Sequence, residues 1–164
     1  MIIDDEVKAV SLAVIVVVGV FTASQALLGG RVVEPFSELA VLGSNMKIGD
    51  YPGEILTGEA FKLYLYVGNH EGKTMYYSVL VKLGDSSTPV NETRPMQVPI
   101  MAKFERVLLN GENWTRPLTL SIDEEGVGQR VVLELWTYDG SVNDVNYSGQ
   151  WNQIWINVTQ PKTP

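Results

Sequence analysis

The side chains able to perform nucleophilic, acid–base or metal chemistry are few among these 164 residues. The sequence has no cysteine and a single histidine, His70, which excludes disulfides, zinc–thiolate sites and mechanisms that need two imidazoles. His70 lies in the turn-like stretch Asn69-His70-Glu71-Gly72, with no serine at a recognisable catalytic spacing. We therefore predict that the protein is not an enzyme, with no catalytic residues, no cofactor and no metal centre.

Two acidic runs are the remaining candidates for binding a cation. Asp123-Glu124-Glu125 is typical of a solvated turn. The run from Asp139 to Asp144 places oxygen ligands at alternate positions, but it lacks the sixth-position glycine and the distal glutamate of an EF-hand loop. We expect a hairpin loop there rather than a calcium site.

Four Asn-x-Ser/Thr triplets are candidate acceptors for N-linked glycans. Their asparagines are Asn91, Asn113, Asn146 and Asn157. Four triplets exceed what the composition would supply by chance, so we predict a glycan at one or more of them. The alternative is that threonine-rich strands and asparagine-rich turns generate the triplets and no enzyme reads them.

Three tyrosines, Tyr64, Tyr66 and Tyr76, lie in two neighbouring segments of alternating polar and apolar residues. Together they are a candidate partner surface, for sugars or for another chain. The alternative is that they form cross-strand pairs that stabilise a half-buried sheet.

Tryptophans gather later in the sequence, where Trp136, Trp151 and Trp155 are interleaved with valine and isoleucine. We expect these three to pack in the core rather than to form a binding platform. The uncharged stretch from Met96 to Met101 is interrupted by proline, which favours an edge strand or a loop. A docking segment is the alternative for that stretch.

The overall charge argues against one class of partner. The 19 acidic residues against 12 basic ones give a net charge of −7, whereas nucleic-acid binding needs clustered lysine and arginine. Because of this acidic charge, no nucleic-acid partner is expected. Hydrophobic residues make up 45% of the chain, which is enough to bury a core.

An uncharged run separates Lys8 from Arg31. As a helix, residues 9–30 would extend about 33 Å, enough for the hydrocarbon core of a bilayer of about 30 Å. We predict a transmembrane helix at 9–30, a short cytoplasmic tail at 1–8 and a linker at 31–35. The alternatives are a cleaved signal peptide, a buried core helix and a pilin-like assembly helix. The small residues Gly19, Ala23 and Ala26 offer a face for packing against another membrane helix.

Orientation follows from the sequons, because the basic residues flanking the run are balanced. All four sequons come after the run. Residues 36–164 are therefore predicted to be an extracytoplasmic domain.

Period-two alternation dominates that domain, as in Phe61 to Val67, Tyr77 to Leu83 and Val131 to Trp136. The first two segments are joined by a turn-rich stretch and are predicted to pair as a hairpin. Together with Phe36 to Leu42 and later segments, the pattern gives seven to eight strands. We predict an all-β, immunoglobulin-like antiparallel β-sandwich preceded by one N-terminal transmembrane α-helix; a closed barrel is the alternative.

Four strings carry a resemblance to a known family: residues 36–43 (FSELAVLG), 48–52 (IGDYP), 66–72 (YVGNHEG) and 149–159 (GQWNQIWINVT). In their order they resemble a family of archaeal predicted membrane proteins known as domain of unknown function 1616. The resemblance implies an archaeal envelope protein and transfers no catalytic residue. Many members have several spans before this domain, whereas one is expected here.

These observations predict a non-catalytic, membrane-anchored cell-envelope protein, an accessory or structural subunit of a larger membrane or surface complex such as glycosylation, export or surface-layer machinery. The alternatives are an archaeal surface filament or archaellum-stator-like component, and a glycan-binding surface module. Expected partners are the bilayer through residues 9–30, other membrane or envelope proteins, and N-linked glycans. The expected location is the cell membrane, crossed once.

Overall fold

The computed structural model describes residues 4–28 and 34–161. The chain divides into two compact units at Glu34 and Pro35, and each is described here by itself. The predicted helix end at Gly29 and Gly30, and most of the predicted linker, lie outside the described residues.

The first unit contains one helix, α1, which spans Asp5–Leu28 and so begins four residues before the predicted span. Asp5 and Glu6 occupy its first turn, where negative charge complements the helix dipole. The Thr22 hydroxyl donates to the Val18 carbonyl at 2.9 Å, and the Ser24 hydroxyl donates to the Phe21 carbonyl at 2.8 Å. These two polar groups are therefore satisfied within the helix, without water.

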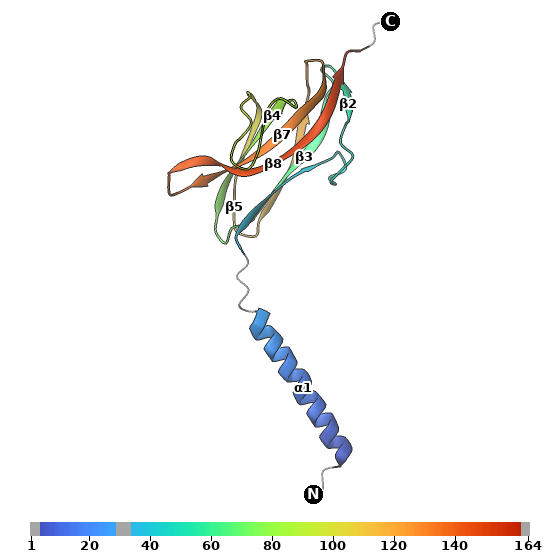
Figure 1. Ribbon diagram of the computed structural model, residues 1–164, viewed down its shortest axis with the longest axis vertical. Helices are drawn as coiled ribbons and strands as arrows, with labels where there is room; N and C mark the ends of the chain where they lie inside the picture. Colours follow the sequence, from blue (N-terminus) through green and yellow to red (C-terminus); the bar gives the residue numbers. More distant parts are fainter. Residues whose placement is uncertain (1–3, 29–33, 162–164) are drawn as a thin grey trace. The chain divides into compact units, whose positions relative to one another are not determined.

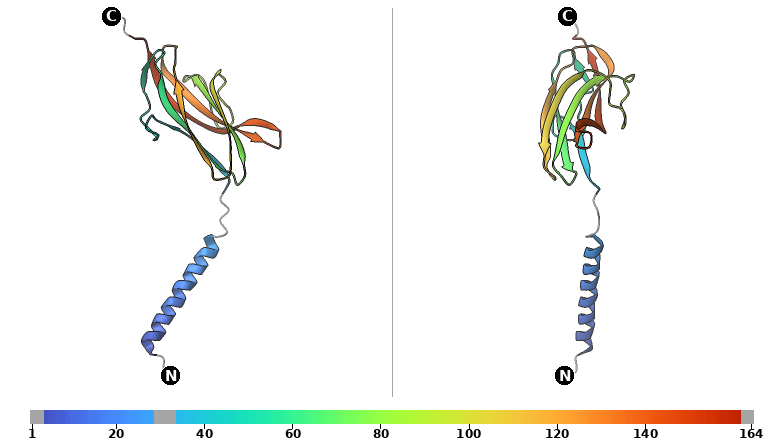
Figure 2. Two further views of the ribbon diagram at one scale, coloured as in Figure 1. Left: turned by 180° about the vertical axis from the view of Figure 1, so that it is seen from behind. Right: turned by 90° about the vertical axis from the view of Figure 1, so that its left-hand side faces the viewer.

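The second unit is a sandwich of two β-sheets (Figures 1 and 2). Its strands, within the described residues, are β1 (Phe36–Leu42), β2 (Glu54–Leu56), β3 (Phe61–His70), β4 (Met75–Gly84), β5 (Ile100–Leu108), β6 (Asn113–Leu120), β7 (Gly126–Asp139) and β8 (Asp144–Thr159). One sheet has the order β1-β3-β6 and the other β2-β8-β7-β4-β5. The pairing is antiparallel except between β2 and β8. The predicted immunoglobulin-like sandwich with one N-terminal apolar helix is confirmed.

Alternating side chains from both sheets fill the space between the layers. Leu63, Leu65 and Val67 of β3 are fully buried there, as are Leu133 and Leu135 of β7. Successive residues of a strand point to opposite faces, so each buried residue leaves its neighbour on the outer face of its sheet. The outer-face residues are therefore the ones that can form a site.

The predicted hairpin of Phe61–Val67 with Tyr77–Leu83 is wrong, because β3 and β4 belong to different sheets. The stretch between them is an arch from one layer to the other. The fully buried Asn69 supports this arch by donating its side-chain amide to the carbonyls of Lys73 at 2.8 Å and Leu108 at 2.9 Å. Turn-forming residues serve an arch as well as a hairpin, so the sequence pattern did not separate the two.

The long connection between β4 and β5, residues 85–99, is held against the outer face of the five-stranded sheet by a buried ion pair. Lys82 Nζ lies 2.8 Å from Glu134 Oε2, and the two side chains are 6% and 0% exposed. Both side chains also bind the backbone of Met96. Lys82 Nζ donates to the Met96 carbonyl at 2.7 Å, and the Met96 N–H donates to Glu134 Oε1 at 2.5 Å. Met96 is thus buried in the loop part of the stretch predicted as edge strand or loop, and β5 is an edge strand.

Removing one member of this pair should destabilise the domain strongly, because its partner stays buried without a counter-charge. We expect Glu134→Ala to lower the free energy of unfolding by about 3–5 kcal/mol. The double variant Lys82→Met/Glu134→Leu leaves no buried charge and should lose less. Urea unfolding of the full chain in detergent, followed by tryptophan fluorescence, measures both; equal losses would contradict the role of the pair.

Candidate functional site

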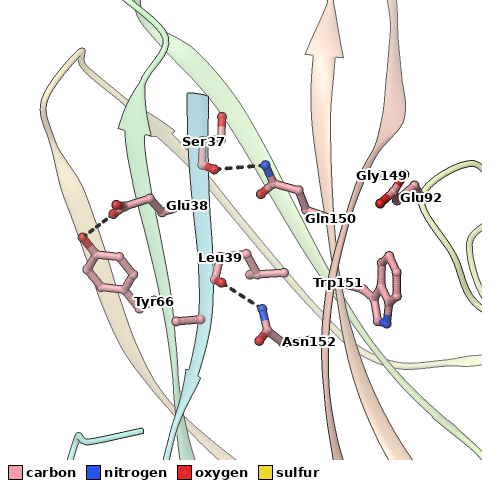
Figure 3. A pocket seen from close by; sticks show the side chains of 10 residues that line it. Ser37, Glu38, Leu39, Tyr66, Glu92, Gly149, Gln150, Trp151 and Asn152 are labelled. Atoms are coloured by element: carbon pink, nitrogen blue, oxygen red, sulfur yellow. Dashed lines mark hydrogen bonds between the residues drawn. The ribbon is translucent and has the colours of Figure 1, made fainter. Parts of the chain in front are cut away.

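A groove of about 570 Å³ lies between β1 and β8 and is here called the β1–β8 groove (Figure 3). The backbone of β1 forms one wall, and residues 149–152 of β8 form the other. Its side chains include Glu38, Tyr66, Glu92, Gln150, Trp151 and Asn152. The groove thus combines two carboxylates, two amides, a phenol and an indole.

Two amides of β8 connect the sheets along this groove. Gln150 Nε2 donates to the Ser37 carbonyl at 3.0 Å, and Asn152 Nδ2 donates to the Leu39 carbonyl at 2.8 Å. Figure 3 shows both side chains reaching from β8 toward β1. They bind carbonyls of β1, an edge strand that has no strand partner on this side among the described residues. The groove floor is therefore held by side chains instead of a β-ladder.

A polar cluster lies beside the groove at the start of β1. Tyr66 donates its hydroxyl to Glu38 at 3.0 Å, and His70 Nε2 lies 3.6 Å from the same carboxylate. Burial, reinforced by Glu38, raises the pKa of Tyr66 above its ordinary value. The His70 ring stacks on Phe36 with 4.7 Å between centroids. The lone histidine is thus a neighbour of Glu38 at the edge of the site.

Ser37, the serine of β1 beside this cluster, is committed to two partners. Its hydroxyl donates to Glu71 Oε1 at 2.6 Å and lies 2.8 Å from the Tyr77 hydroxyl, which must then be the donor. Burial raises the pKa of Tyr77, which favours this neutral donor. The arrangement orders the start of β1. The groove itself offers hydrogen-bonding groups and aromatic rings for binding.

The β4–β5 loop reaches the groove through a tight turn from Asn91 to Arg94. This turn rests on Gly149 of β8, where a Cβ would lie 2.6 Å from the Glu92 carbonyl oxygen. Gly149 also has φ of +81°, a conformation that side chains other than glycine rarely adopt. Glycine here allows the turn to approach β8 and brings Glu92 next to Trp151.

The four sequon asparagines are all exposed. Asn91 lies in the loop turn, and Asn113 is the first residue of the edge strand β6. Asn146 lies in β8 opposite Thr137, next to the hairpin loop. Asn157 lies in β8 between β2 and β7, and its Oδ1 accepts the Gly128 N–H at 2.8 Å. Only exposure is common to them, and their glycosylation stays a prediction.

The three tyrosines predicted as a partner surface do not form one platform. Tyr64 and Tyr66 lie on β3, whereas Tyr76 lies on β4 in the other sheet. The Tyr76 hydroxyl binds Glu105, and this contact raises the pKa of Tyr76 to about 12. A binding role for Tyr64 and Tyr66 stays a prediction.

The expectation that Trp136, Trp151 and Trp155 pack in the core is wrong. All three lie outside the core: Trp136 and Trp151 are partly exposed, and Trp155 is 47% exposed. Their alternation with the buried Leu135, Ile154 and Ile156 already indicates the outer face. Trp151, with Gln150, Asn152 and Glu92, is the part of the site that the sequence reasoning missed, although this parity signal was available for Trp151.

The acidic run from Asp139 to Asp144 is the expected hairpin loop, since these two residues pair across β7 and β8. Asp139 accepts hydrogen bonds from the Ser141 hydroxyl and N–H, which lower the pKa of the carboxyl. No cluster of three or more metal-ligating side chains occurs within residues 4–28 and 34–161. Figure 1 shows the β7–β8 hairpin projecting from the sandwich.

Fold and groove define an immunoglobulin-like sandwich domain that follows an apolar helix. The chain belongs to the family described as Domain of unknown function (DUF1616), which matches residues 31–157. Two of the four strings that carried the resemblance, at 36–43 and 149–159, contribute the two walls of the groove. A search of curated protein sequences finds no match.

Solved structures with a similar fold include the CARDB domain of the PF1109 protein from Pyrococcus furiosus, at 12% identity and a TM-score of 0.50, covering 78% of this chain and 98% of that domain. A β-glucosidase from Listeria innocua matches at 14% identity and a TM-score of 0.47, covering 76% of this chain. The chain spans 16% of that enzyme's length. These likenesses concern the fold alone.

Replacing Gly149 should displace the loop turn from β8. We expect Gly149→Ala to cost about 1–3 kcal/mol, because it adds backbone strain and a contact with Glu92. Amide hydrogen exchange of residues 88–96 should become faster. Gly140→Ala is the matched control, since its Cβ would have 3.9 Å to the nearest atom; equal effects at both positions would contradict this account.

Tyr147 supplies a prediction about alkaline pH. Its buried hydroxyl has no hydrogen-bond partner among the described residues, and burial, with the charges of Glu134 and Glu92, raises its pKa to about 12. In the unfolded chain the pKa of a tyrosine is about 10. The contribution of the neutral Tyr147 phenol to folding stability is therefore fully present below pH 10, and it is lost as the pH rises through 12. Tyr147→Phe should match the wild type at pH 7 and exceed it in urea unfolding at pH 11. Equal loss in both proteins would contradict the prediction.

Proposed function

We propose that the protein is a single-span membrane protein whose sandwich lies outside the cytoplasm and acts as a non-catalytic accessory subunit of a larger envelope complex. The observation that carries this proposal is the free apolar surface of α1. From Asp5 to Ala26 the helix is long and apolar enough to cross a membrane, and none of it is buried in the described structure.

The composition of α1 supports an anchor over a soluble helix. An apolar helix without a polar stripe has to be covered by lipid or by other apolar helices. Such a helix near the N-terminus is compatible with a membrane anchor and with a signal sequence. Acidic residues at the start and the length of the run favour the anchor.

A partner in the membrane is the second part of the proposal. Gly19, Ala23 and Ala26 lie on one face of α1, at spacings of four and three residues. Small residues on one face let two helix backbones approach closely within lipid. A Cβ at Gly19 would have no atom within 4 Å in the described structure, so this face is open to a neighbouring helix.

The test is isolation of the full chain from its own membranes in mild detergent, with mass spectrometry of co-purifying proteins and of each sequon peptide. We expect the chain to resist alkaline extraction, to carry glycan on at least one sequon and to be recovered in fixed ratio with other membrane proteins. Release by alkali, cleavage after the helix, or recovery of the chain alone would overturn the proposal.

The contact through α1 has its own variant. Gly19→Leu should reduce recovery of the partners about tenfold, corresponding to about 1.4 kcal/mol of lost packing. Ala13→Leu is the control, because this residue lies about 120° away around the helix. Unchanged recovery with Gly19→Leu, or equal loss with both variants, would contradict helix packing at this face.

A further inference from the structure

A second, smaller hollow lies where the β4–β5 loop meets Trp151 of β8. It has a volume of about 230 Å³ and is lined by Asn91, Glu92, Thr93 and Trp151. Here it is called the Asn91 hollow. It shares Glu92 and Trp151 with the β1–β8 groove, so a group that fills it has further room along the groove.

Asn91 is held so that one atom of its side chain is left free. Its Oδ1 accepts hydrogen bonds from the Thr93 N–H at 2.9 Å, the Thr93 hydroxyl at 3.0 Å and the Arg94 N–H at 2.8 Å. Its Nδ2 makes no hydrogen bond within the described residues, and the residue is exposed. The nitrogen that receives a glycan is thus presented to solvent, and the sequon hydroxyl fixes the amide.

The other sequons differ from Asn91 in their surroundings. Asn157 lies within β8, with strands on both sides and its Oδ1 bound to Gly128. Neither Asn113 nor Asn146 receives a hydrogen bond from its own sequon hydroxyl in the described structure. Asn91 lines the Asn91 hollow, whereas Asn113, Asn146 and Asn157 line neither this hollow nor the β1–β8 groove. Asn91 alone combines a prepared amide with a hollow of its own.

Trp151 gives this hollow an aromatic wall. The indole is partly exposed on the outer face of the five-stranded sheet, beside Glu92, and the two are drawn together in Figure 3. One face of a sugar ring consists of C–H groups that pack on an aromatic ring, while its hydroxyls need polar partners. The Glu92 carboxylate and the Thr93 hydroxyl supply polar groups at the same place.

We propose that Asn91 carries an N-linked glycan whose first sugar occupies the Asn91 hollow and packs against Trp151. In the attachment, Asn91 Nδ2 forms a bond to the anomeric carbon of a lipid-phosphate-linked oligosaccharide. The anomeric C–O bond to phosphate breaks, the phosphate leaves with the electron pair, and the proton that Nδ2 loses passes to solvent. The sugars that follow have the β1–β8 groove beside them.

Covalent attachment makes a weak contact sufficient. A free sugar on one tryptophan would bind poorly, since one aromatic contact contributes little against the entropy of association. A tethered sugar is present at an effective concentration in the millimolar range. The occupant most consistent with the site is therefore the chain's own glycan. This inference rests on the extracytoplasmic placement in the proposed function.

The test is a double-mutant cycle on the glycosylated full chain from its own membranes. Asn91→Gln should lower the melting temperature by about 3 °C more in the wild-type background than in a Trp151→Ala background. Trp155→Ala, an exposed tryptophan on the same strand, is the matched control background and should leave the full difference. In protein made by a host without N-glycosylation, the difference should vanish.

Each outcome decides the inference. Glycan at Asn91 together with the background-dependent shift supports it. A shift of equal size in all backgrounds, or one that persists without glycan, overturns it, because the loop turn and Trp151 would then be coupled without a sugar. Glycan at Asn113 or Asn146 with none at Asn91 overturns this inference and leaves the extracytoplasmic placement standing. The absence of glycan from all four sequon peptides contradicts the placement itself.

Discussion

The position of the β4–β5 loop depends on the buried pair of Lys82 and Glu134. A buried ion pair is costly to desolvate and contributes little net stability compared with apolar residues. This pair instead binds both backbone groups of Met96, so it selects one placement for a long loop. From that placement follow the seating of the loop turn on Gly149 and the nearness of Glu92 to Trp151. The Lys82–Glu134 pair beneath the loop thereby helps to place Glu92 beside Trp151 on the surface.

Much of the sandwich could be predicted from the sequence, because the core-facing residues leave a period-two record in strands such as β3, even though β4 and β7 are buried on both faces at their centres. The boundaries of β1 and the alternation in β3, β4 and β7 are read from that record. The sheet to which each strand belongs cannot be predicted in this way. A turn of Asn, His, Glu and Gly can join two strands of one sheet as a hairpin or two strands of different sheets as an arch. The fully buried Asn69 decides between them through contacts to Lys73 and Leu108, and the latter is distant in sequence.

The candidate site was less accessible to prediction. The four sequons can be recognised directly in the sequence, and their asparagines are exposed in the structure. The groove, however, is made where residues near 38 and near 151 meet, and no local pattern encodes that encounter. Tryptophan was expected inside because it is large and apolar, whereas strand parity places Trp151 and Trp155 outside. Where residue type and parity disagree in a strand with one buried face, parity is the stronger guide.

The amide bridges from β8 to β1 join residues 113 positions apart, and β8 also pairs with β2 and β7. β8 is the last of the described strands. Since the chain is synthesised from its N-terminus, the sandwich cannot close until β8 has been made. Such long-range pairing makes folding slow, since loop closure precedes the contacts that reward it. During that delay β2 lacks its strand partner and β1 lacks the amide contacts from β8, although β1 already has β3 to pair with. The turn from Asn91 to Arg94 likewise lacks the surface at Gly149 on which it rests.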